Sequence, residues 1–152
     1  MKRMLYGLLA FGFLLADSAS AQLAAGSMDV QWNSGAADCK VNPPQPLQVH
    51  RYNENTYILR ESLCTTYEAP FMYLLIGDAK ALLIDTGDVT EAQKVPLAST
   101  VMSLLPSVGG SKMPLIVVHT HGHLDHRSGD AQFTSMPQVT IVGTDLAHVT
   151  EY

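Results

Sequence analysis

A short apolar segment runs directly into a cluster of histidines. Residues 114–118 read PLIVV, and residues 119–126 read HTHGHLDH and hold four of the chain's six histidines. A continuous apolar run of this length is typical of a strand that is covered on both faces. The sequence therefore predicts a polar, chemically active loop at the end of a buried strand.

Strand and helix patterns alternate around this segment. Strands are predicted where apolar residues alternate or run together, at 47–52, 56–60, 71–76, 79–85 and 138–142. Gly77-Asp78 suits a tight hairpin between the third and fourth of these. Helices are predicted over 90–105, which Pro96 divides or opens, from 126 to 133, and from 144 onward. The alternation indicates an α/β or α+β layered domain.

The first 21 residues have the three parts of a signal peptide. Lys2 and Arg3 precede an apolar run at 4–16, and the small residues Ala19-Ser20-Ala21 follow. Thirteen apolar residues are fewer than the roughly 20 that span a bilayer as a helix. We expect cleavage after Ala21, a secreted or periplasmic location, and no membrane segment in the remaining chain.

The rest of the chain divides at about residue 47. Residues 22–46 are rich in Ala, Gly, Ser, Asn and Pro and are expected to form a flexible N-terminal arm, whereas 47–152 form one domain. Removing the leader changes the formal net charge from −5 to −6. An acidic chain without a basic block is not expected to bind nucleic acid.

The chain has two cysteines, Cys39 and Cys64, both in its exported part. An oxidising compartment would let them form a disulfide, and two free thiols are the alternative. Neither lies in a CxxC pattern, so neither is predicted to bind metal.

The spacing of the histidines predicts a metal site. Alternate residues share a side of an extended chain, so His121 and His123 can reach one ion, while Asp125 and His126 can face a second point nearby. Zinc prefers such ligands when thiolates are absent, and iron or manganese also accept them. The alternative is a solvated polar loop, which is disfavoured because burying several imidazoles without a metal or acidic partners is costly. One or two ions are expected.

Two motifs resemble those of a known family. Residues 120–126 (THGHLDH) are similar to the signature of the metallo-β-lactamase superfamily, and residues 82–87 (LLIDTG) resemble the strand and loop that precede it there. The resemblance implies an αββα sandwich with a metal site at one edge of its two sheets, and hydrolysis of a small-molecule substrate.

The resemblance also implies a role for each residue. His121 and His123 would bind the first metal, and Asp125 and His126 the second. Asp125 would in addition be catalytic, because it would orient a metal-bound hydroxide that attacks the substrate. Asp85 would accept a hydrogen bond that orients a ligand; its alternative is to cap the loop after its strand.

The remaining histidines are not predicted to be ligands. His119 is interpreted as a packed structural residue, and His50 and His148 as surface or core residues. Complete sites of this family draw another histidine, a bridging aspartate and a last histidine from the C-terminal half. The chain thus resembles an N-terminal half, which we expect to bind metal weakly and to leave one sheet face exposed.

Three functions remain open. The first is an exported metal-dependent hydrolase of an ester, lactone, thioester or β-lactam-type bond. The second is a non-catalytic exported module for metal binding or interaction. The third, an iron-based redox member of the same superfamily, is disfavoured because the glutamate typical of such redox members is missing between the histidines. The oligomeric state is open.

Overall fold

The computed structural model describes residues 25–152. The predicted signal peptide, residues 1–21, lies outside this part of the chain. None of the helices in the described part is both long enough and apolar enough to span a membrane.

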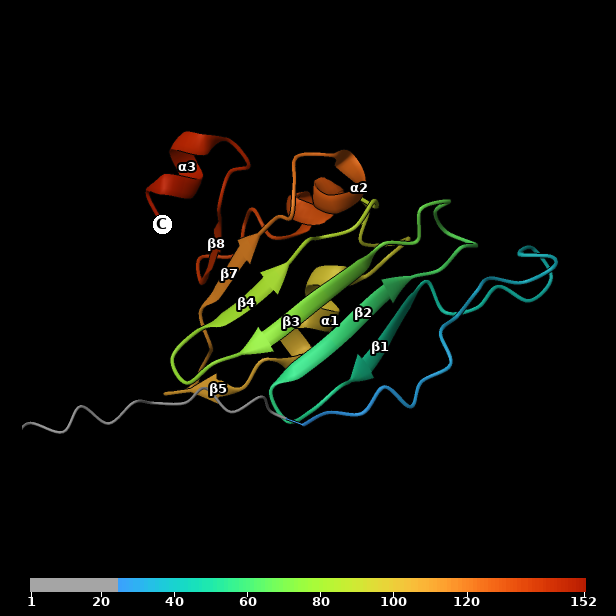
Figure 1. Cartoon of the computed structure of the whole chain (residues 1–152), viewed down its shortest axis with the longest axis horizontal. Coiled ribbons are helices and arrows are strands. Elements are labelled where there is room, and N and C mark those ends of the chain that lie inside the picture. The colour runs from blue at the N-terminus through green and yellow to red at the C-terminus, as the bar shows by residue number, and fades with distance from the viewer. Residues whose placement is uncertain (1–24) are drawn as a thin grey trace, which may run out of the picture.

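A six-stranded mixed sheet organises the chain (Figure 1), in the order β1-β2-β3-β4-β7-β8. Its strands are β1 Leu47–Arg51, β2 Thr56–Glu61, β3 Phe71–Ile76, β4 Ala81–Ile84, β7 Leu115–Val118 and β8 Val139–Ile141. The first four form an antiparallel meander, and the pairs β4–β7 and β7–β8 are parallel. Each predicted strand is confirmed. The parallel pairing of β4 with β7 brings their carboxyl ends to the same edge of the sheet.

The helices are shorter than predicted. They are α1 Leu97–Leu104, α2 Leu124–Arg127, the 3-10 helix η1 Ser128–Gln132 and α3 Leu146–Thr150. The prediction of a helix from residue 90 was wrong, because α1 begins only after Pro96. A proline disfavours helical geometry in the residue before it, so the helix starts at the proline and does not run through it.

A small ribbon follows α1. Its strands are β5 Ser107–Val108 and β6 Ser111–Lys112, joined by Gly109 and Gly110, whose φ angles are +61° and +85°. The two glycines take left-handed conformations that suit a hairpin turn. The sequence prediction ended the helix at residue 105 but did not include the ribbon.

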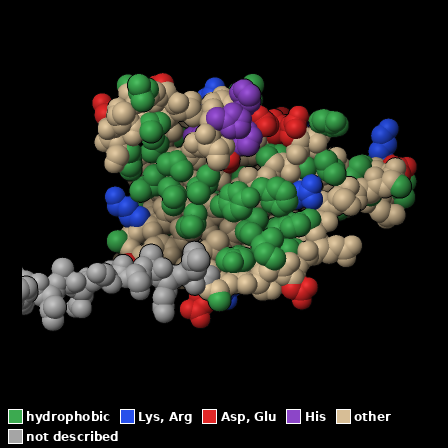
Figure 2. Space-filling view, viewed as in Figure 1, with side chains coloured by type: hydrophobic (Ala, Val, Ile, Leu, Met, Phe, Trp, Pro, Cys, Tyr) green, Lys and Arg blue, Asp and Glu red, His purple; other side chains and the backbone are tan. Residues whose placement is uncertain are grey.

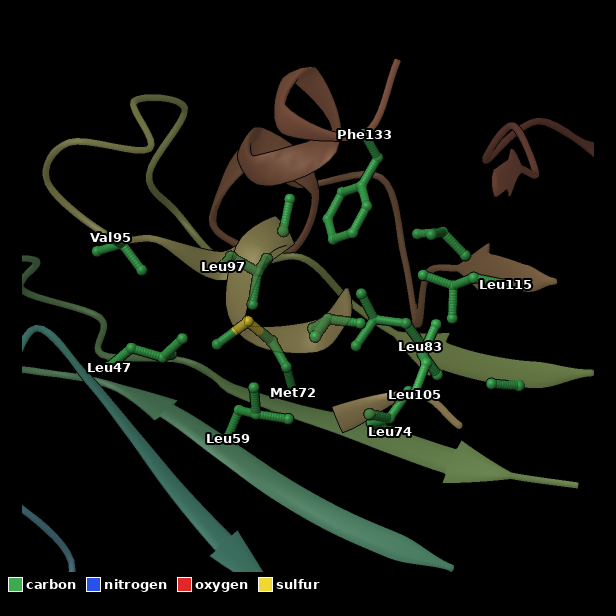
Figure 3. Close-up of a cluster of buried hydrophobic side chains, with 14 of the residues drawn as sticks. Leu47, Leu59, Met72, Leu74, Leu83, Val95, Leu97, Leu105, Leu115 and Phe133 are labelled. Atoms are coloured by element: carbon green, nitrogen blue, oxygen red, sulfur yellow. The ribbon is translucent and has the colours of Figure 1, made fainter. Parts of the chain in front are cut away.

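The hydrophobic core lies between the sheet and α1 (Figure 3). Alternate residues of the strands point to this side, among them Met72, Leu74 and Leu83, none of which is exposed. Leu97 and Val101 of α1 pack against them and are equally buried. Burying each such side chain stabilises the fold by about 1.5–3 kcal/mol.

The opposite face of the sheet is only partly covered. Tyr73 and Leu75 of β3 are 40% and 38% exposed there, and Figure 2 shows hydrophobic side chains gathered over the strands on this side of the molecule. Residues 25–152 form one large sheet and the small ribbon. The second sheet of an αββα sandwich is therefore not formed by the described residues.

Residues 25–46 have no helix or strand but are fastened to the sheet. Cys39 forms a disulfide with Cys64 in the loop after β2, which settles the alternative left open by the sequence. Trp32 packs edge-on against Phe71 and His50, with ring centroids 5.0 Å and 5.8 Å away. The arm therefore shields part of the open sheet face.

Candidate metal centre

Asp85 follows β4 at the edge where the parallel strands end. Its φ is +64°, its side chain is 3% exposed, and its backbone N–H donates to the carbonyl of Val118 at 2.9 Å. Aspartate is one of the few residues that adopt this left-handed conformation with little strain. The turn directs the carboxylate toward the loop that follows β7.

The Asp85 carboxylate is the acceptor for two residues of that loop. Oδ1 accepts the Thr120 backbone N–H at 2.8 Å, and Oδ2 accepts the Thr120 hydroxyl at 2.9 Å. Oδ2 also lies 2.8 Å from Nδ1 of His126. Asp85 therefore fixes both the backbone and one imidazole of the histidine loop, which is the contact that a ligand-orienting carboxylate makes.

The four residues predicted as ligands lie together. The ring of His121 is 4.5 Å from that of His123 and 4.1 Å from that of His126, measured between centroids. Nε2 of His126 is 3.2 Å from Oδ2 of Asp125. His121 and His123 are exposed, whereas Asp125 and His126 are partly buried. Figure 2 shows the histidines grouped at this edge, next to acidic side chains.

The side chains of His121, His123, His126 and Asp125 are chemically suited to bind a metal ion. Their donor atoms, however, are not arranged around one point. Three imidazoles and a carboxylate are donors that zinc accepts. Among residues 25–152, however, no three His, Cys, Asp or Glu side chains are positioned to share an ion. Both ring nitrogens of His126 face carboxylates instead. Exposed rings such as His121 and His123 change rotamer readily, so the donors can turn toward an ion.

A buried polar network lies beneath the cluster. Thr86 is fully buried; its N–H donates to the carbonyl of His126 at 2.8 Å, and its hydroxyl donates to Oδ1 of Asp130 at 2.9 Å. The same oxygen lies 2.9 Å from Nε2 of His119, whose side chain is 1% exposed. Nδ1 of His119 has no partner among the described residues. His119 is thus a packed residue whose contact with Asp130 supports the histidine loop.

Gly129 makes the close contact between these segments possible. A Cβ at this position would lie 2.1 Å from the carbonyl oxygen of Thr86. Only a glycine allows the start of η1 to approach the loop after β4 so closely. Sequence patterns did not single out Gly129, Thr86 or Asp130 for a role at the site, because their contacts join segments far apart in the chain.

An open cavity of about 390 Å³ adjoins the cluster. Its lining combines site residues with the loop after β2 and with β3: Glu68, Pro70, Phe71, Tyr73, Asp85, Thr120, Asp125 and His126. A slightly larger hollow of about 440 Å³ lies between the arm and β1, but no titratable side chain lines it. The smaller cavity is therefore the one that adjoins the candidate chemistry.

Glu61 is a buried carboxyl that the sequence did not predict. It is 1% exposed at the end of β2. Burial raises its pKa to about 7, against hydrogen bonds from the Thr66 hydroxyl and the Asp88 backbone N–H that lower the pKa. The alternation of β2 places residue 61 on the core face, which is the signal that could have identified it.

His50 and His148 lie outside the cluster. His50 contacts Trp32 and the carbonyl oxygen of Ser27. His148 pairs with Asp145, which caps α3. Neither histidine shares a hydrogen bond or ring contact with the histidine loop among those found in the described residues.

Solved structures similar to this chain include metallo-beta-lactamases. The enzyme from Hirschia baltica is 15% identical, with a TM-score of 0.47, and the match covers 69% of this chain and 46% of that one. The enzyme FIM-1 from Pseudomonas aeruginosa, in its mono-zinc form, is 12% identical, with a TM-score of 0.45 and coverages of 64% and 42%. The enzyme from Erythrobacter litoralis is 17% identical, with a TM-score of 0.45 and coverages of 63% and 40%. The match spans less than half the length of each.

The sequence itself matches a family. No curated protein matches the chain. The model of the metallo-beta-lactamase superfamily, however, matches residues 66–149, which is more than half of the chain and includes both Asp85 and the histidine loop. The fold agrees, with a mixed sheet and few helices. The chain therefore belongs to the metallo-β-lactamase superfamily.

Proposed function

We propose that this chain carries part of the active site of an exported, zinc-dependent hydrolase that cleaves an ester, lactone, thioester or β-lactam-type bond in a small molecule. The observation that carries the proposal is the meeting of His121, His123, His126 and Asp125 at one strand edge, with the Asp85 carboxylate behind them. A buried carboxylate bonded to one imidazole of a histidine cluster is typical of a metal centre.

Each side chain has a distinct task. His121 and His123 would hold one ion, and Asp125 and His126 a second. When bound, zinc supplies an acidified water and polarises the carbonyl oxygen of the substrate. In the tautomer with the proton on Nδ1, His126 donates a hydrogen bond to Asp85, and its Nε2 would have a lone pair for a ligand bond. Asp125 would accept a hydrogen bond from the attacking water and so orient it.

The adjacent cavity is suited to a small substrate. Its volume of about 390 Å³ lies within the range of roughly 300–1,000 Å³ that is usual for ligand pockets. Phe71 and Tyr73 contribute aromatic rings to its lining, and Asp125 and His126 contribute candidate ligands. A substrate bound there would contact both the rings and the proposed metal site.

Metal binding by these side chains alone is expected to be weak. Shared between two ions, they give each ion two protein ligands, whereas catalytic zinc sites usually have three. Further donors must complete the coordination. A non-catalytic metal-binding module is the second candidate, because the described donors are not arranged around an ion in advance.

Export is part of the proposal. The leader pattern of residues 1–21 supports it, and so does the Cys39–Cys64 disulfide, because such bonds persist in oxidising compartments. If export is correct, the protein recovered from the periplasm or medium begins at Gln22 by mass spectrometry. An intact leader on the mature protein would contradict it.

Zinc titration calorimetry and a hydrolysis panel test the function. The panel contains nitrocefin, an aryl ester, a lactone and a thioester, each measured with and without zinc. Weak zinc binding and little, zinc-dependent turnover are expected for the wild type, and both should be lost in His121→Ala and His123→Ala but kept in His50→Ala. Binding without turnover would favour the non-catalytic module, and no binding would refute both candidates.

A further inference from the structure

Glu61 places a carboxyl group on the apolar side of the sheet. It is the last residue of β2, its register partner on β1 is the buried Leu47, and Leu59 precedes it on the same face. Burying a carboxyl group costs free energy unless hydrogen bonds compensate it. Its partners therefore show why a polar group occupies this place.

The two oxygens of Glu61 bind two different loops. Oε2 accepts the hydroxyl of Thr66 at 3.1 Å, in the loop 62–70 between β2 and β3. Oε1 accepts the backbone N–H of Asp88 at 3.1 Å, in the loop after β4. The Thr66 oxygen in turn accepts the N–H of Ala69 at 3.1 Å. One carboxyl group thus connects the two loops directly.

Gly87 passes directly over this carboxyl group. Its φ is +76°, and a Cβ built on it would lie 2.2 Å from Oε1 of Glu61. The loop after β4 can approach Glu61 this closely only with a glycine at that position. The backbone of Gly87 therefore packs closely against the Glu61 carboxyl group, next to the hydrogen bond that this group accepts from Asp88.

Both loops reach the candidate site. The loop 62–70 contributes Glu68 and Pro70 to the wall of the cavity. The loop after β4 begins with Asp85, and the carbonyl oxygen of Gly87 accepts the N–H of Ser128 at 3.0 Å, at the end of the helix that carries His126. A displacement of either loop relative to the other would change the distance between the cavity wall and the ligands.

We propose that Glu61 is a positioning residue that ties the cavity-wall loop 62–70 to the loop 85–88, and so holds the cavity and the metal ligands in one arrangement. Its effect on metal binding rests on the proposed function, whereas the connection between the loops does not. Glutamine preserves both contacts, since its carbonyl oxygen accepts from Asp88 and its amide donates to Thr66. Alanine removes both.

Hydrogen exchange measured by mass spectrometry tests the connection. In Glu61→Ala we expect exchange in both loops, 62–70 and 85–89, to rise about tenfold, as the loss of a buried hydrogen bond implies. At a pH below the Glu61 pKa of about 7, Glu61→Gln should exchange like the wild type. Leu59→Ala, which truncates a buried neighbour on the same strand face, is the matched control and should not loosen these loops selectively. Loosening of one loop alone, or the same pattern in Leu59→Ala or Glu61→Gln, would overturn the proposal.

Zinc titration of the same proteins separates the two proposals. Glu61→Ala should bind zinc about tenfold more weakly than the wild type, as removal of an outer support of a metal site does, and Glu61→Gln should match the wild type. If the wild type binds no zinc, the proposed function fails while the exchange data still decide the role of Glu61. Unchanged zinc affinity in Glu61→Ala would refute the positioning role.

A second variant covers the case in which Glu61→Ala does not fold. Thr66→Val removes only the hydroxyl that Glu61 binds, and Thr134→Val removes an exposed hydroxyl elsewhere. Because the Thr66 hydroxyl also accepts the N–H of Ala69, the deciding readout is the other loop. We expect Thr66→Val, and not Thr134→Val, to raise exchange in loop 85–88 as well as in loop 62–70 and to weaken zinc binding. Identical behaviour of the two variants would overturn the proposal.

Discussion

The Asp85 carboxylate lies 2.8 Å from Nδ1 of His126, although the two residues are 41 positions apart in the chain. Asp85 therefore sets the ring orientation of one predicted ligand. We expect Asp85→Asn to keep the fold, since asparagine also adopts positive φ with little strain. The amide oxygen of the variant is needed at the Oδ1 position to accept the Thr120 N–H, so its amide nitrogen faces Nδ1 of His126 and cannot accept a hydrogen bond from it. Zinc affinity should therefore fall about 10- to 100-fold.

Calorimetric zinc titration and circular dichroism check this prediction together. The variant should show a wild-type spectrum with weakened binding. An affinity within twofold of the wild type would mean that Asp85 only caps its loop.

Gly129 should not tolerate a side chain. A Cβ would lie 2.1 Å from the carbonyl oxygen of Thr86, where backbone must move to make room. Gly129→Ala is therefore expected to lower the free energy of unfolding by about 1–3 kcal/mol. Gly122→Ala is the control, because its nearest neighbour would be 3.4 Å away. Urea denaturation measures both, and equal losses would contradict the packing between η1 and the loop after β4.

The disulfide should contribute substantially to stability. Cys39 and Cys64 are 25 residues apart, so the bond removes many conformations from the unfolded chain. Replacing both by serine is expected to cost about 3 kcal/mol. Thermal unfolding of the double variant should match that of the reduced wild type. If the double variant and the reduced wild type both unfold at the same temperature as the oxidised wild type, residues 25–46 add little to the stability of the sheet.

Glu61 should make stability depend on pH. Burial raises its pKa from 4.5 to about 7 in the folded protein. The folded state therefore holds this proton more tightly, and the stability that it contributes is complete below about 4.5 and lost as the pH rises through about 7. Between pH 5 and 8 the wild type should lose up to about 3 kcal/mol relative to Glu61→Gln.

Denaturation of both proteins across this pH range measures the difference. Glu54→Gln, at an exposed position, controls for the removal of a negative charge. A constant difference between wild type and Glu61→Gln from pH 5 to 8 would show that Glu61 does not titrate in this interval.

Local patterns were enough to predict the strands but not every helix end. The alternation around Met72 and Leu74 and the apolar run at 115–118 reflect burial directly, so each strand of the six-stranded sheet was found, whereas the exposed ribbon was not. The helix over 90–105 was predicted too long, because the apolar spacing after Pro96 was extended backward through residues that form turns. The ends of helices depend on caps and tertiary contacts as well as on spacing.

The histidine loop could be recognised from sequence because its residues are adjacent in the chain. The supporting residues could not be recognised in this way. Thr86 and Asp130 are 44 positions apart, and Glu61 and Asp88 are 27 apart. Their pairing follows from the order of strands in the sheet, which no local pattern encodes. The metal-binding roles of His121, His123, Asp125 and His126 themselves stay predictions.

The parallel pairing of β4 with β7 also has a consequence for the order of folding. The meander of β1 to β4 joins neighbours in sequence, whereas β4 and β7 pair across an intervening segment that contains α1. Closing such a long connection costs more chain entropy than closing a hairpin, so it follows the local pairings. Asp85 meets Thr120 and His126 only across this crossover. We therefore expect the contact of Asp85 with the histidine loop to form late in folding, after the meander.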